Sequence, residues 1–177
     1  MAGLDFPSLL DRRVRDIPDY PQPGVVFKDI TPLLADHTAF AGVIDAIVGY
    51  RGAGTVDKVV GIEARGFIVA APVAYHMGAG FVPVRKKGKL PSATYEQSYA
   101  LEYGEATLEV HRDAFAAGDR VLIVDDVLAT GGTAAATTEL VRRAGGVVVG
   151  VAVLIELGFL NGRAALPGVD VHSIMSV

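Results

Sequence analysis

The chain has 177 residues, no cysteine, a hydrophobic content of 51% and a formal net charge of −4. This length suits one domain with a sizeable core, and the apolar content excludes intrinsic disorder. The missing cysteines exclude disulfides, zinc–thiolate sites and thiol nucleophiles, and the acidic balance argues against a nucleic-acid-binding protein.

The first part of the chain predicts a helix, a turn-rich stretch and a second helix. Apolar residues from Phe6 to Val14 have helical spacing, and Pro7 suits a first helical turn. Residues 17–24 hold three prolines and a glycine, so regular structure is not expected there. From Phe40 to Val48, apolar residues again recur on one helical face.

Strands and helices alternate in the remainder. Strands are predicted at 56–64, 81–84, around Leu108 and Val110, at 121–124 and at 147–157, and helices at 67–77 and 132–144. Residues 85–91 are expected to break regularity, and the polar, tyrosine-rich segment 92–105 to form a long loop. The alternation predicts an α/β fold with a mainly parallel twisted sheet flanked by helices. Ligands bind such sheets at the carboxyl ends of the strands.

The most informative segment runs from Val121 to Thr133. An apolar strand leads into Asp125 and Asp126, and Ala129-Thr-Gly-Gly-Thr then opens a helix. Glycines let backbone N–H groups approach a phosphate, and a helix N-terminus adds donors and partial positive charge. Ionised carboxylates accept hydrogen bonds from vicinal sugar hydroxyls. The segment lacks both the Walker ending and the dinucleotide fingerprint. It predicts a sugar-phosphate site, and the plainer alternative is a glycine-containing turn.

This segment resembles the phosphoribosyl pyrophosphate motif of type I phosphoribosyltransferases and matches it fully. The resemblance implies that Asp125 and Asp126 hold the ribose hydroxyls. It implies that the 5-phosphate is bound by Ala129, Thr130, Gly131, Gly132 and Thr133. It also implies one domain over residues 1–177, with an N-terminal base-binding hood at about 1–35 and a flexible lid loop at about 86–106.

Four further segments resemble the adenine phosphoribosyltransferases within that family. They are 18–32, 61–67, 85–91 and 99–104, and the resemblance covers about 14–156 in the expected order. It implies transfer of a phosphoribosyl group from phosphoribosyl pyrophosphate to adenine, giving AMP and pyrophosphate in purine salvage. It further implies a cytoplasmic homodimer and a magnesium ion held mainly by the substrate.

Phe27 lies in the Pro/Gly-rich part of the first of these segments. An aromatic ring there could stack on a base, a contact worth roughly 1–3 kcal/mol. It could equally cover the core as an apolar plug. The resemblance favours stacking, and it implies that main-chain groups of Val26 and Lys28 read the adenine edge.

Arg65 follows a predicted buried strand and precedes Gly66. A guanidinium at a strand's carboxyl end suits pyrophosphate, although it could also be a surface arginine at a helix start. The resemblance assigns it to pyrophosphate and implies a non-proline cis peptide at Glu63–Ala64. This sequence has Glu-Ala where family members often have Asp-Ser.

Four cations occupy five positions directly after the predicted strand 81–84. Such a run is usually a solvated surface. The donor substrate carries several negative charges, however, and the resemblance implies that Arg85 and Lys89 bind its pyrophosphate. Lys86 and Lys87 are then expected to be solvated.

Glu102 and Tyr103 belong to the predicted lid. An oxocarbenium-like centre is destroyed by water, so a closing loop has a chemical purpose. The resemblance implies that Glu102 is the catalytic acid/base for the purine proton and that Tyr103 is a lid contact. Spacing alone favours an ordinary exposed glutamate.

Three other functions compete with this hypothesis. A xanthine or hypoxanthine-guanine phosphoribosyltransferase would share residues 125–133 but not 18–32. A ligand-sensing regulator on the same fold would need a DNA-binding domain, for which the chain shows neither spare length nor a basic stretch. A sugar hydrolase needs carboxylates on opposite sides of a bond, which the adjacent Asp125 and Asp126 cannot supply.

Membrane and secretory signals are weak in this sequence. The longest apolar run, Val147 to Ile155, is too short for a membrane span, and the N-terminus lacks a basic and an apolar signal region. We therefore expect a soluble cytoplasmic protein with no membrane partner.

Overall fold

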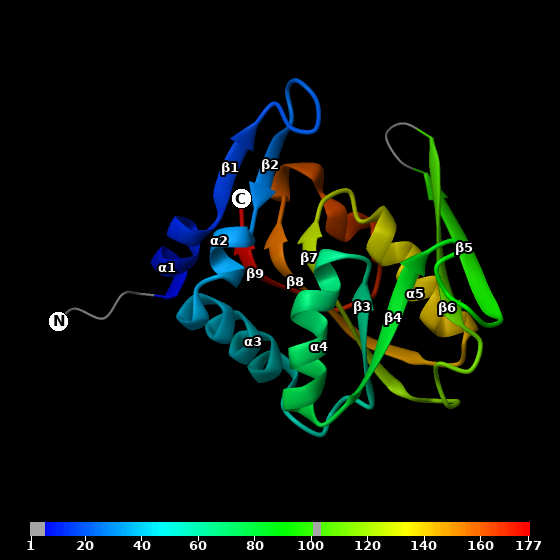
Figure 1. Ribbon diagram of the computed structural model, residues 1–177. Coiled ribbons are helices and arrows are strands. Elements are labelled where there is room, and N and C mark those ends of the chain that lie inside the picture. The colour runs from blue at the N-terminus through cyan, green and yellow to red at the C-terminus, as the bar shows by residue number, and fades with distance from the viewer. Residues whose placement is uncertain (1–5, 101–103) are drawn as a thin grey trace. The chain divides into compact units, whose positions relative to one another are not determined.

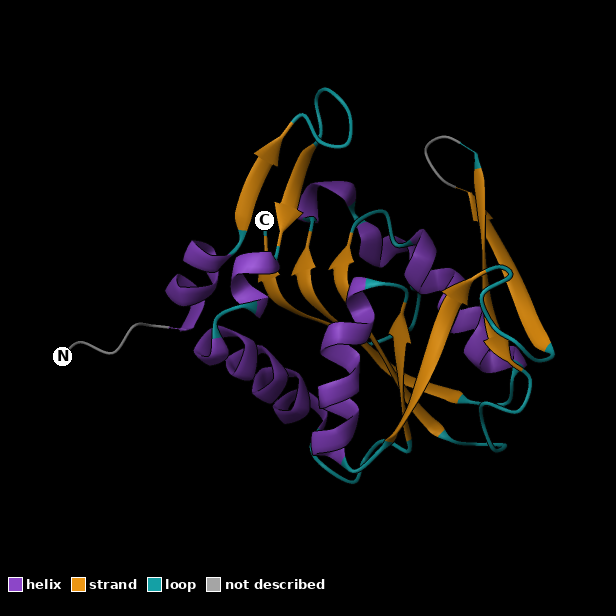
Figure 2. Ribbon diagram, viewed as in Figure 1, coloured by secondary structure: helices purple, strands orange, loops and turns teal. Residues whose placement is uncertain are grey.

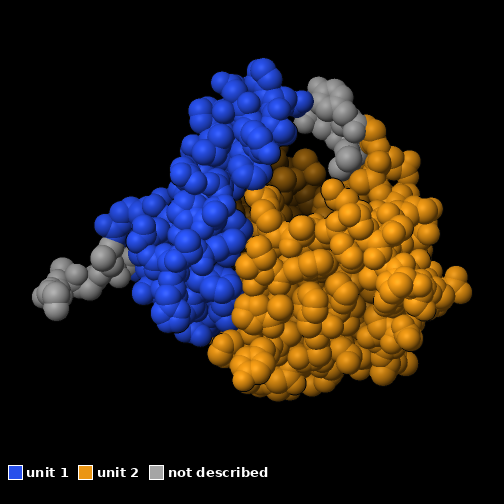
Figure 3. Space-filling view, in the orientation of Figure 1, with its two compact units in different colours: residues 1–46 blue, residues 47–177 orange. Residues whose placement is uncertain are grey.

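A computed structural model describes residues 6–100 and 104–177 (Figure 1). The chain divides into two compact units, residues 1–46 and residues 47–177, which Figure 3 colours separately. Within the described residues no helix is long and apolar enough to cross a membrane.

The first unit contains a small antiparallel hairpin among helices. Its elements are α1 (Phe6–Arg13), β1 (Arg15–Pro18), β2 (Val26–Asp29), α2 (Thr31–Leu34) and the first part of α3 (His37–Arg51). In the hairpin, Ile17 is opposite Phe27 and Pro18 is opposite Val26. The expectation that 17–24 lacks regular structure is therefore wrong at its first two residues. Proline is tolerated at a strand end, and the pairing partner lies outside that window.

The second unit is built on a seven-stranded sheet with the order β5-β6-β4-β3-β7-β8-β9. Its strands are β3 (Lys58–Ile62), β4 (Gly80–Lys86), β5 (Thr94–Ala100), β6 (Glu105–His111), β7 (Arg120–Leu128), β8 (Val147–Glu156) and β9 (Val171–Ser176). The five strands from β4 to β9 in this order pair in parallel, and β6 and β5 add an antiparallel edge (Figure 2). The predicted α/β class with a mainly parallel sheet is confirmed.

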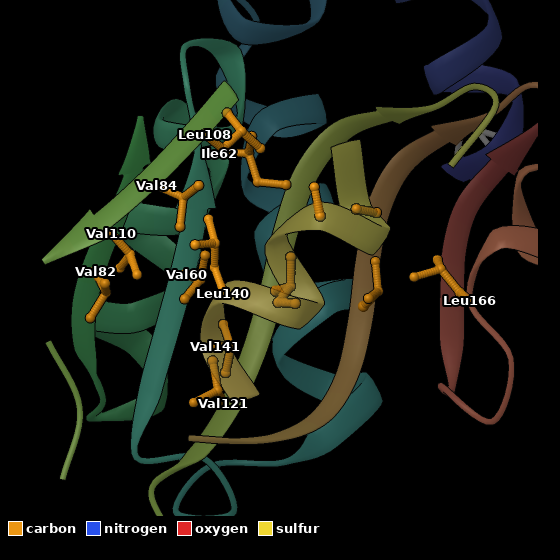
Figure 4. Close-up of a cluster of buried hydrophobic side chains, with 14 of the residues drawn as sticks. Val60, Ile62, Val82, Val84, Leu108, Val110, Val121, Leu140, Val141 and Leu166 are labelled. Atoms are coloured by element: carbon orange, nitrogen blue, oxygen red, sulfur yellow. The ribbon is translucent and has the colours of Figure 1, made fainter. Parts of the chain in front are cut away.

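Two helices cover opposite faces of this sheet. On β3, Val60 and Ile62 join a buried cluster with Leu140 of α5 (Gly132–Arg143), as Figure 4 shows. Gly61 points the other way, toward α4 (Arg65–Met77), where a Cβ on it would lie 2.9 Å from the Ala70 methyl group. Alternate residues of a strand face opposite sides, so the two faces bind different helices.

In the segment 92–105, predicted to be a long loop, residues 94–100 form the strand β5 and Glu105 begins β6, while residues 101–103 lie outside the described residues. Tyr95, Gln97 and Tyr99 are partly buried, whereas Glu96, Ser98 and Ala100 are exposed. This is the period-2 pattern of a strand, with polar or amphipathic side chains on the inner face instead of aliphatic ones. The loop prediction is wrong because the segment has little apolar periodicity, whereas its tyrosines Tyr95 and Tyr99 pack against the core.

Two strands also extend further than predicted. β4 continues through Arg85 and Lys86, which pair with Glu109 and Leu108 of β6. β7 continues through Asp125 and Asp126 to Leu128, which pairs with Glu156 of β8. In both cases a neighbouring strand supplies hydrogen-bond partners beyond the apolar run. The strand β9 and the 3₁₀ turns η1 (Gly158–Leu160) and η2 (Gly162–Ala165) were not predicted.

Candidate active site

A cavity of about 330 Å³ opens in the second unit, where β3 and β7 end and α4 and α5 begin. It lies at the carboxyl ends of parallel strands, where open α/β sheets bind their ligands. Its polar lining comes from four parts of the chain: Glu63 and Arg65, Lys86, Tyr99, and the run from Asp125 to Thr133.

All five residues predicted to bind the 5-phosphate line this cavity. Gly131 has a φ of 85°, a left-handed conformation that favours glycine, and α5 begins at the next residue. The first N–H groups of a helix have no partner within the helix and carry partial positive charge. The loop therefore has the features of an anion site without a basic side chain. Binding of the 5-phosphate there stays a prediction.

Asp125 and Asp126 lie beside this anion site. Arg65 approaches Asp126, with 2.9 Å between Nη2 and Oδ2, and the Asp126 side chain is only 8% exposed. The backbone N–H of Asp126 donates to Oδ1 of Asp125 at 2.9 Å. Burial, followed by the charge of Asp126, raises the pKa of Asp125 well above its ordinary value. Arg65 therefore pairs directly with Asp126, and its charge opposes part of the rise in the pKa of Asp125. The two acidic side chains can accept hydrogen bonds from a polar ligand.

Close packing behind this pair requires Gly66. A Cβ on Gly66 would lie 2.7 Å from Oδ1 of Asp125 and 3.1 Å from the Val124 carbonyl oxygen. The glycine allows the start of α4 to approach the end of β7. Arg65 consequently reaches Asp126. The resemblance had placed these two residues in different subsites, Arg65 at the pyrophosphate and Asp126 at the ribose.

Glu63, just after the end of β3, lines the same cavity. Its Oε2 accepts hydrogen bonds from Arg85 Nε at 3.0 Å and from the Lys86 backbone N–H at 3.1 Å. Burial opposes ionisation of Glu63, but these two donors outweigh it and lower its pKa. The peptide between Glu63 and Ala64 is cis, as expected from the resemblance.

The basic run divides differently from the prediction. Lys86 is exposed, as expected, and it also lines the cavity. Lys87 pairs with Glu96, with 2.7 Å between Nζ and Oε2. Arg85 and Lys89 do not line the cavity as the structure describes it, and Arg85 donates to Glu63 and to the Lys89 carbonyl oxygen. Pyrophosphate binding by Arg85 and Lys89 stays a prediction.

Tyr99, which lies in the segment predicted to be a long loop, lines the cavity. The Thr133 hydroxyl donates to the Tyr99 hydroxyl at 3.2 Å, and the Tyr99 ring lies 3.3 Å from the Cβ position of Gly132. The inner-face alternation of β5 was the signal that could have placed it here.

The predicted base-reading residues belong to the first unit. Phe27 lies on β2 and meets Tyr20 edge to face, with 5.1 Å between ring centroids. The Lys28 amine pairs with Asp16 at 2.7 Å, and half of Val26 is exposed. The adenine contacts of Val26, Phe27 and Lys28 stay predictions. Glu102 and Tyr103 lie outside the described residues. The acid/base role of Glu102 and the lid contact of Tyr103 therefore stay predictions.

Comparisons with known proteins agree with this site. A family model described as "Phosphoribosyl transferase domain" matches residues 29–166. The chain is 66% identical to the adenine phosphoribosyltransferase of Acidothermus cellulolyticus over 177 residues, covering 100% of both, and 61% identical to that of Thermobifida fusca, covering 99% of both.

Solved structures give the same result. The adenine phosphoribosyltransferase of Rhodothermus marinus is 53% identical with a TM-score of 0.93, covering 97% of this chain and 98% of that one. The enzyme from Saccharomyces cerevisiae, complexed with an imino-altritol bisphosphate and adenine, is 36% identical with a TM-score of 0.90, covering 96% and 98%. With this family match, these identities and the sugar-phosphate geometry of the cavity, the chain belongs to the phosphoribosyltransferase family, among the adenine phosphoribosyltransferases.

Proposed function

We infer that this protein transfers the 5-phosphoribosyl group of phosphoribosyl pyrophosphate to adenine, forming AMP and pyrophosphate in purine salvage. The observation that carries this is the junction of β7 and α5, where two carboxylates and a helix N-terminus line one cavity. Relatives that this chain matches over nearly its full length, at 66% and 61% identity, are adenine phosphoribosyltransferases.

The cavity suggests how the donor is oriented. Its 5-phosphate would accept hydrogen bonds from the N–H groups of residues 129–133, which need no rearrangement to receive an anion. The ribose hydroxyls would donate to the carboxylates of Asp125 and Asp126. The pyrophosphate would then extend toward Arg65 and Lys86, the cations that line the same cavity.

The reaction exchanges one bond at the anomeric carbon. The bond from that carbon to the pyrophosphate oxygen breaks, the bond to a purine nitrogen forms, and that nitrogen loses its proton. The site contributes by holding the donor in place and by stabilising negative charge on the leaving group. Arg65, Lys86 and the proposed partners Arg85 and Lys89 supply positive charge for the latter.

The purine side of the reaction rests on residues implied by the family. Phe27 is proposed to stack on adenine, and the main-chain groups of Val26 and Lys28 to read its edge. Glu102 is proposed to accept the purine proton, with Tyr103 contacting the substrates from the lid. The adenine named with the yeast structure supports the choice of base.

Magnesium is the proposed cofactor. No group of three or more His, Cys, Asp or Glu side chains among the described residues could hold a metal alone, and the carboxylates that line the cavity are Glu63, Asp125 and Asp126. This donor set fits a Mg²⁺ ion that keeps its waters and binds mainly substrate oxygens. Such an ion would offset the negative charge of the leaving pyrophosphate. Chelation should abolish turnover and added magnesium should restore it, whereas turnover that survives exhaustive chelation contradicts the proposal.

The experiment for the activity is a turnover assay. Purified protein with magnesium and phosphoribosyl pyrophosphate should convert adenine to AMP, followed by chromatography of the nucleotide. Guanine, hypoxanthine, xanthine and orotate serve as competing bases. Strong activity on one of these with none on adenine would overturn the assignment and favour the hypoxanthine-guanine or xanthine alternative.

Homodimer formation and a cytoplasmic location are further proposals that follow from the family. Sedimentation equilibrium of the purified chain tests the first: a mass of twice 18.5 kDa is expected, and a monomer at catalytic concentrations contradicts it. Fractionation of cells that express the untagged chain tests the second.

A further inference from the structure

The loop proposed to bind the 5-phosphate, residues 129–133, is here called the phosphate loop. It packs against the turn η2, which has no part in the proposed reaction. A Cβ on Gly162, the first residue of η2, would overlap the Ala129 carbonyl oxygen and lie 3.0 Å from Leu128 Cγ. Conversely, a Cβ on Gly131 would overlap the Gly162 carbonyl oxygen and lie 2.8 Å from Ala165 Cβ. The loop and the turn therefore lie backbone against backbone, so neither can yield by rotating a side chain.

The same turn is fastened to the sheet through Arg163. Its guanidinium makes a two-point pair with Glu156 at the end of β8, with Nε–Oε1 at 2.7 Å and Nη2–Oε2 at 2.8 Å. It also donates to the Val171 carbonyl oxygen at 2.7 Å and to Ser173 Oγ at 3.2 Å, both on β9. Ser173 Oγ in turn donates to Glu156 at 2.7 Å.

This network is more than an exposed ion pair. The Glu156 side chain is 11% exposed, and each of its oxygens accepts a hydrogen bond. Two-point arginine–carboxylate pairs fix direction as well as distance, and a shared network couples its members. Arg163 is not among the residues that line the cavity, so any effect it has on a ligand is indirect, through the turn or through Glu156, which pairs with Leu128 of β7.

We propose that the η2 turn, clamped by Arg163 onto Glu156, positions the phosphate loop and thereby sets the protein's affinity for the 5-phosphate. Gly162 and Arg163 are positioning residues, since neither is placed to touch the substrate. The proposal rests on the proposed function, because it assigns the 5-phosphate to residues 129–133. It predicts that a substitution in the turn weakens binding of the donor's 5-phosphate and leaves binding of its pyrophosphate unchanged.

The test measures the binding of two probes by calorimetry in the presence of magnesium. Ribose 5-phosphate reports on the phosphate loop, and pyrophosphate reports on the proposed pyrophosphate site at Arg65 and Lys86. Gly162→Ala should weaken ribose 5-phosphate by about tenfold, equivalent to losing one hydrogen bond to a charged group. The affinity for pyrophosphate should change less than about twofold, a difference in binding free energy of only about 0.4 kcal/mol. Gly158→Ala is the matched control, since its Cβ would meet nothing closer than 3.5 Å.

The clamp is tested separately. Arg163→Gln should weaken ribose 5-phosphate, and Arg163→Lys should recover part of the loss because it keeps the charge but not the two-point geometry. Arg142→Gln, which removes an exposed pair with Glu139 on α5, should change neither probe. The Arg163 variants also serve as the test if Gly162→Ala does not fold.

Two outcomes overturn the proposal: unchanged affinity for ribose 5-phosphate in folded Gly162→Ala and Arg163→Gln, or equal weakening of both probes together with a lower melting temperature. The second would show general destabilisation. Wild-type turnover of adenine, assayed in parallel, separates this failure from a failure of the proposed function, because the binding measurements need no catalysis.

Discussion

Two regions of the second unit meet at the same cavity but are encoded in different ways. In the β7–α5 region, an apolar strand, two aspartates and a glycine-rich helix start follow one another, and each residue's neighbours in sequence are its neighbours in space. In the β4–β5 region, pairing of β4 with β3 brings Lys86 to the cavity, and pairing of β5 with β6, which itself pairs with β4, brings Tyr99 there. A binding loop within one local unit can be recognised from sequence, whereas a wall assembled by strand pairing cannot.

The largest effect is expected from the locally encoded region. Asp126→Ala removes a proposed ribose ligand together with the carboxylate that pairs with Arg65. We expect kcat/KM for phosphoribosyl pyrophosphate to fall on the order of 100-fold, with weaker AMP binding, since breaking a buried pair costs several kcal/mol. Steady-state kinetics and AMP calorimetry measure this. Asp113→Ala, an exposed carboxylate outside the cavity, is the control, and unchanged affinities for Asp126→Ala would remove its assigned role.

The pairing-dependent region is tested by two adjacent lysines. Lys86 lines the cavity and Lys87 pairs with Glu96 away from it. Lys86→Ala should raise KM for phosphoribosyl pyrophosphate by about tenfold, as for one charge-assisted hydrogen bond, while Lys87→Ala should leave it nearly unchanged. Equal effects in both variants would mean that only the overall charge of the run matters.

The carboxylate pair of Asp125 and Asp126 should also affect how stability depends on pH. Asp125 has a pKa raised by burial and by Asp126, so the folded state holds its proton more tightly than the unfolded state. Its favourable contribution is therefore present below the ordinary carboxyl pKa and is lost as pH rises through the raised value. Asp125→Asn should melt at a higher temperature than the wild type at neutral pH, with the difference shrinking toward pH 4. Thermal denaturation across pH 4–8 measures this, and a pH-independent difference would contradict it.

The smallest effect is expected at Tyr99. Tyr99→Phe removes the acceptor of the 3.2 Å hydrogen bond from Thr133 but keeps the ring against Gly132. KM for the donor should rise about twofold to threefold, in line with one neutral hydrogen bond of modest net strength. Tyr95→Phe on the same inner face is the matched control. If both variants match the wild type, β5 contributes packing alone.

Most of the fold was predictable because aliphatic strands and amphipathic helices have distinct periods. Helix α5 and strands β3 and β8 all lie within a few residues of their predicted ranges. The errors fall where polar side chains face inward, as in β5, or where a neighbouring strand extends pairing past the apolar run, as in β4 and β7. Both depend on contacts between segments distant in sequence.

By itself, the sequence determined the α/β class, the strand–loop–helix order of residues 121–133 that suits a sugar phosphate, and the family to which the chain belongs. These follow from local order, since backbone donors at a helix N-terminus need only a strand, glycines and a helix in succession. Only the tertiary structure decided which cations share the cavity, that Arg65 pairs with Asp126, and that Gly162 lies against the loop. Those contacts join separate strands and turns, and their specificity comes from strand register and close backbone packing, which no local pattern records.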